Sequence, residues 1–226
     1  MPEAISFKTF DGVKIVGDWY PSATTIGVAI LLHMMPLDRK SWAPFQQVLA
    51  KYSIASLAID LRGHGESVVM DGTDTKLDYK KFTDDQHVQY INDVSAALDW
   101  LVNKSYAKDR IMLVGASIGA NIAMAMLEDE PALAGAVLLS PGNYRGIDAV
   151  ELAQYVKTRQ AIWTAGSDSD DTEAYEAAKA IVDTCAASRK QFVAYKNAGH
   201  GIHLFKSDPK LMDNLAAWMK ESLQTI

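Results

Sequence analysis

The fold is decided by residues 111–127, which read IMLVGASIGANIAMAML. Residues 111–114 are continuously apolar, which is typical of a strand covered on both faces in a parallel sheet. Gly115-Ala116-Ser117-Ile118-Gly119 follows, and a helical pattern continues through residues 121–127. The two glycines leave room where a sharp turn brings a strand and a helix together. This arrangement predicts a serine hydroxyl displayed at the edge of the sheet, beside a helix N-terminus.

Further apolar runs alternate with helical patterns along the chain. We expect strands at residues 28–33, 54–60, 136–140, 161–165 and 191–196. Apolar residues recur with helical spacing at residues 42–52, 83–102, 149–156, 172–186 and 209–223. Residues 5–20 instead alternate around Asp11-Gly12, as in a hairpin at a sheet edge. The order predicts an α/β fold: a doubly wound, mostly parallel eight-stranded sheet with an antiparallel N-terminal lead-in and helices on both faces.

Length and composition exclude several classes of protein. The length suits a single domain spanning residues 1–226, and no internal repeat or Pro-rich linker marks a second one. The net charge of -6 does not favour binding to nucleic acid, whose backbone is also negative. The apolar runs are too short to span a bilayer, and the start lacks a signal-peptide pattern. We therefore expect a cytoplasmic protein with neither a membrane nor a nucleic-acid partner, and we find no signal for an oligomeric state. Cys185 is the only cysteine, so no intramolecular disulfide can form.

A serine hydroxyl becomes a good nucleophile only when a base takes its proton. His200 is the strongest candidate, because it lies between the last predicted strand and the last predicted helix, with glycines on both sides. This position brings it to the same sheet edge as Ser117. The order serine, acid, histidine also suits this class of fold. The other histidines are His33 and His64 at the same edge, His203 as a competitor or pocket residue, and His87, expected to be solvated on a helix.

A carboxylate should hold the histidine in the correct tautomer. The loop at residues 166–171 reads GSDSDD and offers three acids, Asp168, Asp170 and Asp171. Acids there also suit the start of the helix that follows.

Negative charge that develops on the substrate needs two backbone donors. The N–H of Ile118 directly follows the serine, and the loop after residues 28–33 offers Met34 or Met35, of which we favour Met35. Apolar residues expected around a modest acyl or alkyl group are Met34, Met35, Trp42, Tyr144 and Leu204.

Five motifs together resemble the α/β-hydrolase superfamily, particularly small serine esterases and dienelactone-hydrolase-like members. They occur in family order over nearly the whole chain: Leu31-Leu32-His33, Ser41-Trp42, Asp60-Leu61-Arg62-Gly63-His64-Gly65-Glu66-Ser67, the motif at 115–119, and Gly199-His200-Gly201. The resemblance implies that Ser117 is the nucleophile, His200 the base and Met35 an oxyanion donor, with a structural turn at residues 60–67.

In relatives, the acid commonly lies three residues beyond the small residue that ends its strand. Counting from Ser167 favours Asp170, with Asp168 second and Asp171 left for helix capping. Two features depart from the family pattern. Met34 stands where relatives usually have glycine, and the nucleophile is serine where dienelactone hydrolases have cysteine.

These observations predict a serine hydrolase that cleaves a small carboxylic ester through an acyl-enzyme, without a cofactor or metal. The alternatives are an inactive binding protein on the same scaffold and a lactone or dienelactone hydrolase. Nucleotide binding is disfavoured, because neither G-x-G-x-x-G nor G-x-x-x-x-G-K-[ST] occurs. His200 and His203 have ligand-like spacing but no third ligand nearby. Only residues 141–160 separate the two strands between which lids usually lie, so no lid domain is expected.

Overall fold

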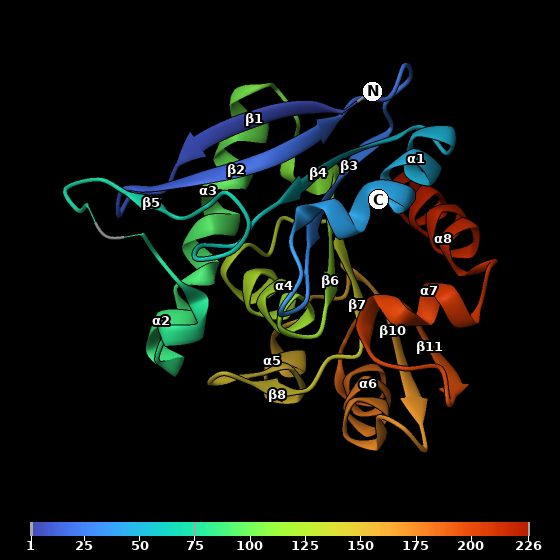
Figure 1. Ribbon diagram of the computed structural model, residues 1–226. Coiled ribbons are helices and arrows are strands. Elements are labelled where there is room, and N and C mark those ends of the chain that lie inside the picture. Colours follow the sequence, from blue (N-terminus) through green and yellow to red (C-terminus); the bar gives the residue numbers. More distant parts are fainter. Residues whose placement is uncertain (1, 75, 226) are drawn as a thin grey trace.

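The structure, a computed structural model, describes residues 2–74 and 76–225 (Figure 1). Its strands are β1 (Glu3–Lys8), β2 (Val13–Tyr20), β3 (Gly27–Leu32), β4 (Ile54–Ile59), β5 (Val69–Met70), β6 (Ile111–Ala116), β7 (Gly135–Leu139), β8 (Asn143–Tyr144), β9 (Ile147–Asp148), β10 (Ala161–Asp168) and β11 (Arg189–Lys196). In the described residues, one sheet has the order β1-β2-β4-β3-β6-β7-β10-β11, and β5 pairs with β2 beside this path. β4 to β11 in this order are parallel, whereas β1 and β2 form the antiparallel lead-in. The predicted fold class is confirmed.

Helices cover both faces of the sheet. They are α1 (Ala43–Lys51), α2 (Asp84–Val88), α3 (Tyr90–Asn103), α4 (Ile118–Asp129), α5 (Ala149–Leu152), α6 (Thr172–Thr184), α7 (Leu204–Ser207) and α8 (Leu211–Thr225). Helices α1 and α8 share one apolar core with the sheet, and α3, α4 and α6 share the other (Figure 1). Over the ranges that the structure describes, no helix combines the length and apolar character needed to cross a membrane.

The alternation within β3 explains why its sequence is apolar throughout. Val28, Ile30 and Leu32 belong to the core under α3 and α4. Ala29 and Leu31 belong to the core under α1 and α8. Because successive side chains point to opposite faces, a strand between two helical layers is apolar at every position.

Three segments differ from the sequence-based expectation. The helix expected at residues 83–102 is divided at Gln89, whose ψ of -7° departs from the helical value. The helix expected at 149–156 is α5 followed by a 3₁₀ turn, Ala153–Tyr155. The hairpin of β8 and β9 was not expected, because two-residue strands carry no periodic pattern. β8, β9, α5 and the 3₁₀ turn make up the stretch of chain that connects β7 to β10, the stretch in which no lid domain was expected.

The turn between β6 and α4 depends on glycine. A Cβ atom added to Gly115 would lie 2.1 Å from the carbonyl oxygen of Gly119. One added to Gly119 would lie 2.3 Å from the carbonyl oxygen of Leu32, the last residue of β3. No heavier residue fits unless the backbone moves. The first turn of α4 is therefore in direct contact with the end of β3.

We expect Gly119→Ala to destabilise the fold by about 3 kcal/mol or more, because the methyl group overlaps a backbone oxygen that cannot rotate away. Gly72→Ala is the control, since no atom lies within 4 Å of its added Cβ and only its positive φ opposes the change. Urea unfolding followed by circular dichroism measures both variants. Equal losses at the two positions would contradict the close approach of α4 to β3.

Candidate active site

Ser117 lies between β6 and α4 in a backbone conformation that L-residues rarely adopt. Its φ is 54° and its ψ is -123°. The N–H of Ser117 donates to the carbonyl of Leu139 at 2.9 Å, and the residue is partly exposed. A strained residue held by its surroundings is a feature of functional sites. The hydroxyl therefore stands at the carboxyl edge of the sheet, as the motif predicted.

His200 and Asp171 form a close pair at the same edge. Nδ1 of His200 lies 2.6 Å from Oδ2 of Asp171. An ionised carboxylate only accepts hydrogen bonds, so Nδ1–H donates, and in the neutral imidazole this tautomer leaves the lone pair on Nε2. Asp171 precedes α6, but its side chain makes no capping hydrogen bond there. Its carboxylate is engaged by the histidine instead.

The expectation that Asp170 faces the histidine is wrong. Asp170 accepts from the hydroxyl of Ser167 at 2.5 Å and from the N–H of Gly199 at 2.7 Å. The hydrogen bond from Ser167 has the largest effect on the pKa of Asp170 and holds it below its usual value. The reason for the difference is that β10 continues to Asp168 and the chain then reverses at Ser169, whose φ is 75°. This reversal turns Asp170 back toward its own strand and brings the next residue, Asp171, to His200.

Asp168, the second choice, is also not the partner of His200. Its carboxylate accepts from the N–H of Ser169 at 2.7 Å and is exposed. Its backbone carbonyl accepts from the N–H of Asn197 at 3.1 Å, which ties the ends of β10 and β11 together.

The loop that carries His200 packs against the residue before Ser117. The N–H of Gly201 donates to the hydroxyl of Ser140 at 2.9 Å. A Cβ added to Gly201 would lie 2.7 Å from Sδ of Met34 and 3.4 Å from Cβ of Ala116. The loops after β3, β6, β7 and β11 therefore meet at one place. His203, three residues beyond His200, is exposed.

His33 holds the loop that follows β3. The N–H of Leu61 donates to Nε2 of His33 at 3.1 Å, so Nδ1 carries the proton and lies 3.1 Å from the carbonyl oxygen of Met34. Complete burial lowers the pKa of His33 and keeps the imidazole neutral. In the described part of the chain, the N–H groups of Met35 and Ile118 donate no hydrogen bond. Both predicted oxyanion donors are therefore available to a ligand.

A cavity of about 410 Å³ opens beside Ser117. Its lining residues are Met35, Asp84, Ser117, Ile118, Asn143, Tyr144 and Arg145. The ring of Tyr144 lies edge-on to that of His200, with centroids 6.0 Å apart. Burial, and then the charge of Asp171, raise the pKa of Tyr144, so its phenol stays protonated. Ser117 and both candidate donor residues therefore line one cavity. The ring of Tyr144 forms part of its wall and also packs against His200.

Three residues predicted for the pocket belong to the core instead. Trp42 is fully buried and packs against Phe45 and Phe205, and Leu204 is fully buried at the start of α7. Met34 is buried next to Gly201 and does not line the cavity. Apolar character alone does not distinguish core from pocket. Arg145 and Asp84 were missed because no motif contains them.

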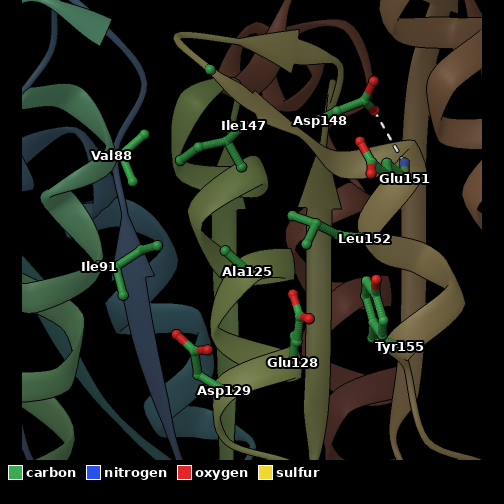
Figure 2. A pocket seen from close by; sticks show the side chains of 11 residues that line it. Val88, Ile91, Ala125, Glu128, Asp129, Ile147, Asp148, Glu151, Leu152 and Tyr155 are labelled. Atoms are coloured by element: carbon green, nitrogen blue, oxygen red, sulfur yellow. Dashed lines mark hydrogen bonds between the residues drawn. The ribbon is translucent and has the colours of Figure 1, made fainter. Parts of the chain in front are cut away.

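A second cavity, of about 330 Å³, lies away from this edge between α3, α4 and α5. Figure 2 shows its apolar residues, including Ile91 and Leu152, together with the carboxylates of Glu128, Asp129 and Glu151. None of its lining residues belongs to the serine or histidine loops. Considering only the described residues, no three His, Cys, Asp or Glu side chains are arranged to hold a metal ion.

The sheet, the serine at a strand-to-helix turn, and a histidine after β11 that pairs with a carboxylate after β10 define an α/β hydrolase. The chain belongs to the serine aminopeptidase family S33, whose sequence profile matches residues 27–145. It is therefore a member of a hydrolase family. A comparison with curated proteins found no match.

Solved structures share this fold over the whole chain at low sequence identity. An esterase from Pyrococcus furiosus superposes with a TM-score of 0.80 and 18% identity, covering 99% of this chain and 93% of its own. An α/β hydrolase from a Penicillium species has a TM-score of 0.79 and 13% identity, with 99% of each chain covered. A carboxyl esterase from Bacillus coagulans has a TM-score of 0.75 and 12% identity, covering 98% and 99%. At such identities the likeness concerns the fold.

Buried histidines lie behind the loop that follows β3. The hydroxyl of Tyr90 is 3.1 Å from Nε2 of His64 and 3.0 Å from Nδ1 of His87. His64 stacks on Tyr79 and packs edge-on against His33. His87 is only 2% exposed, so the expectation that it is solvated is wrong. Burial lowers the pKa of His87 and lowers that of His64 to about 3, with the nearby His33 adding to the second effect.

These pKa values predict that acid destabilises the fold. The folded state keeps His64 neutral, whereas the unfolded chain binds its proton near pH 6.5, so stability falls as the pH falls from about 7. For His64 alone the loss is about 2 kcal/mol at pH 5. We expect His64→Gln to give a shallower dependence in urea unfolding at pH 7 and pH 5. His203→Gln, at an exposed position, should keep the wild-type slope. If the His64→Gln and wild-type curves were parallel, His64 would not be the source.

Proposed function

We propose that this protein hydrolyses small carboxylic esters through an acyl-enzyme formed on Ser117. The observation that carries this proposal is the 2.6 Å pair of His200 and Asp171 beside a serine held at φ 54°. Esterases among the structural neighbours are compatible with it, but one fold hosts many reactions, so the choice rests on the site.

In the proposed reaction, Oγ of Ser117 attacks the ester carbonyl while Nε2 of His200 takes the hydroxyl proton. The carbonyl oxygen becomes an oxyanion and accepts hydrogen bonds from the N–H groups of Met35 and Ile118. When the intermediate collapses, the alcohol leaves with the proton from His200. Water then attacks the acyl group with the same proton transfers in reverse order, which releases the acid and restores Ser117.

The role proposed for Asp171 follows from its hydrogen bond. The carboxylate keeps the proton of His200 on Nδ1, so that Nε2 is a base, and it stabilises the imidazolium that forms. Asp170 has a different proposed role. Its bonds to Ser167 and Gly199 connect β10 to the histidine loop and so support the position of His200.

We expect hydrolysis of 4-nitrophenyl acetate, and we expect Ser117→Ala to reduce kcat by at least about 10³-fold because no other group supplies the nucleophile. A fluorophosphonate probe should label the wild type and leave Ser117→Ala unlabelled. An unlabelled, inactive wild type would favour a binding protein on a hydrolase scaffold. Full activity in Ser117→Ala would show that another residue is the nucleophile.

We expect Asp171→Asn to reduce kcat by about 10³- to 10⁴-fold, since an amide NH₂ favours the wrong histidine tautomer. Asp170→Asn is the matched control, one residue away, and should lose less than about tenfold because it acts only through the loop. Steady-state kinetics on one ester compares them, and circular dichroism checks that both variants fold. A severe defect in Asp170→Asn with near-normal activity in Asp171→Asn would reverse the assignment.

A further inference from the structure

One cation and one carboxylate line the cavity beside Ser117. Arg145 belongs to the β8–β9 hairpin and Asp84 to the first turn of α2. Their closest approach is 3.7 Å, from Nη1 of Arg145 to Oδ1 of Asp84, which is longer than a hydrogen bond. The side chain of Arg145 is 51% exposed. Most of the guanidinium donors are therefore free to bind a ligand that enters the cavity.

The hairpin that carries Arg145 is anchored next to the catalytic turn. Asn121 is fully buried in α4, four residues after Ser117. Its Nδ2 donates to the carbonyls of Gly142 and Ile147, each at 2.7 Å, and its Oδ1 accepts from the N–H of Gly142 at 3.0 Å. One amide thus holds both ends of the hairpin. The position of Arg145 relative to the serine is set by a rigid element.

Arg145 also lies at a position of the hairpin turn that arginine rarely occupies. The hairpin turn consists of Arg145 and Gly146, with φ angles of 54° and 79°. Such turns favour asparagine, aspartate or glycine at the first position. An arginine there keeps a strained backbone while its side chain lines the cavity. Local strain of this kind gathers at ligand-binding positions.

We propose that Arg145 recognises a carboxylate on the substrate, so that the preferred substrates are esters that carry a second, ionised acid group, such as half-esters of dicarboxylic acids. This inference rests on the proposed function and adds its substrate class. The guanidinium forms a planar fork that matches a carboxylate. Asp84 lies beside the guanidinium of Arg145 and competes with the substrate carboxylate for it.

The kinetic test compares an anionic ester with its neutral counterpart. We expect kcat/KM for mono-(4-nitrophenyl) glutarate to exceed that for its methyl ester by about fivefold, a modest factor because the pair is partly exposed. A second pair, 4-acetoxybenzoate and 4-acetoxybenzamide, places the charge on the leaving alcohol. Whichever pair shows the preference identifies the side of the ester that faces Arg145.

The variants should move this ratio in opposite directions. Arg145→Gln should bring it to about one, Arg145→Lys should keep part of it, and Asp84→Asn should raise it severalfold. Arg159→Gln and Asp183→Asn remove the same charges at exposed positions outside this cavity and should leave the ratio unchanged. An unchanged ratio in Arg145→Gln would overturn the inference. So would a preference for an ammonium-bearing ester that Asp84→Asn abolishes.

A binding measurement separates this inference from the proposed function. Ser117→Ala is titrated calorimetrically with the glutarate half-ester and with its methyl ester. Tighter binding of the half-ester that Arg145→Gln removes supports the anion site even if no ester is hydrolysed. Equal binding of the two esters, together with Ser117-dependent hydrolysis, would overturn the anion site and leave the esterase proposal intact.

Discussion

The geometry of the site follows from the close backbone approach at Gly115 and Gly119. It lets the chain turn at Ser117 and begin α4 directly against Leu32 at the end of β3. The loop that follows β3 therefore starts beside the first turn of α4. One packing contact thus brings the serine, the N–H that follows it and the N–H of Met35 to the same edge of the sheet.

A buried charge network supports this edge from behind. Asp60 is fully buried at the end of β4 and accepts from the N–H of Arg39 at 2.8 Å and from that of Glu66 at 2.7 Å. The guanidinium of Arg39 pairs with Asp60 and, at 2.8 Å, with Glu66. A Cβ added to Gly65 would lie 2.1 Å from the Asp60 carboxylate. Buried ion pairs rarely add net stability, because the cost of desolvating the charges offsets their attraction. The turn at residues 60–67 holds the loop after β3 in its place.

The carboxylate that pairs with His200 could be predicted from the sequence only to the level of its loop. The pattern of strand and helix restricted the carboxylate to the loop after β10, and that restriction agrees with the geometry. The choice among neighbours depended on the backbone of Ser169, where a positive φ reverses the chain. No pattern of residue types predicts a positive φ at a serine in such a loop. Asp171 therefore contacts His200, and Asp170 contacts Ser167 and Gly199 instead.

Sequence patterns alone predict the order of strands and helices, the two covered faces of the sheet and the sheet edge to which both Ser117 and His200 belong. Periodicity and chain order carry this information, because burial on two faces requires apolar residues at fixed spacing. The three-dimensional contacts were needed to show which carboxylate faces the histidine, that Trp42 belongs to the core, and that Arg145 lines the cavity. These contacts depend on single turn dihedrals and on segments distant in the chain, which local patterns do not encode.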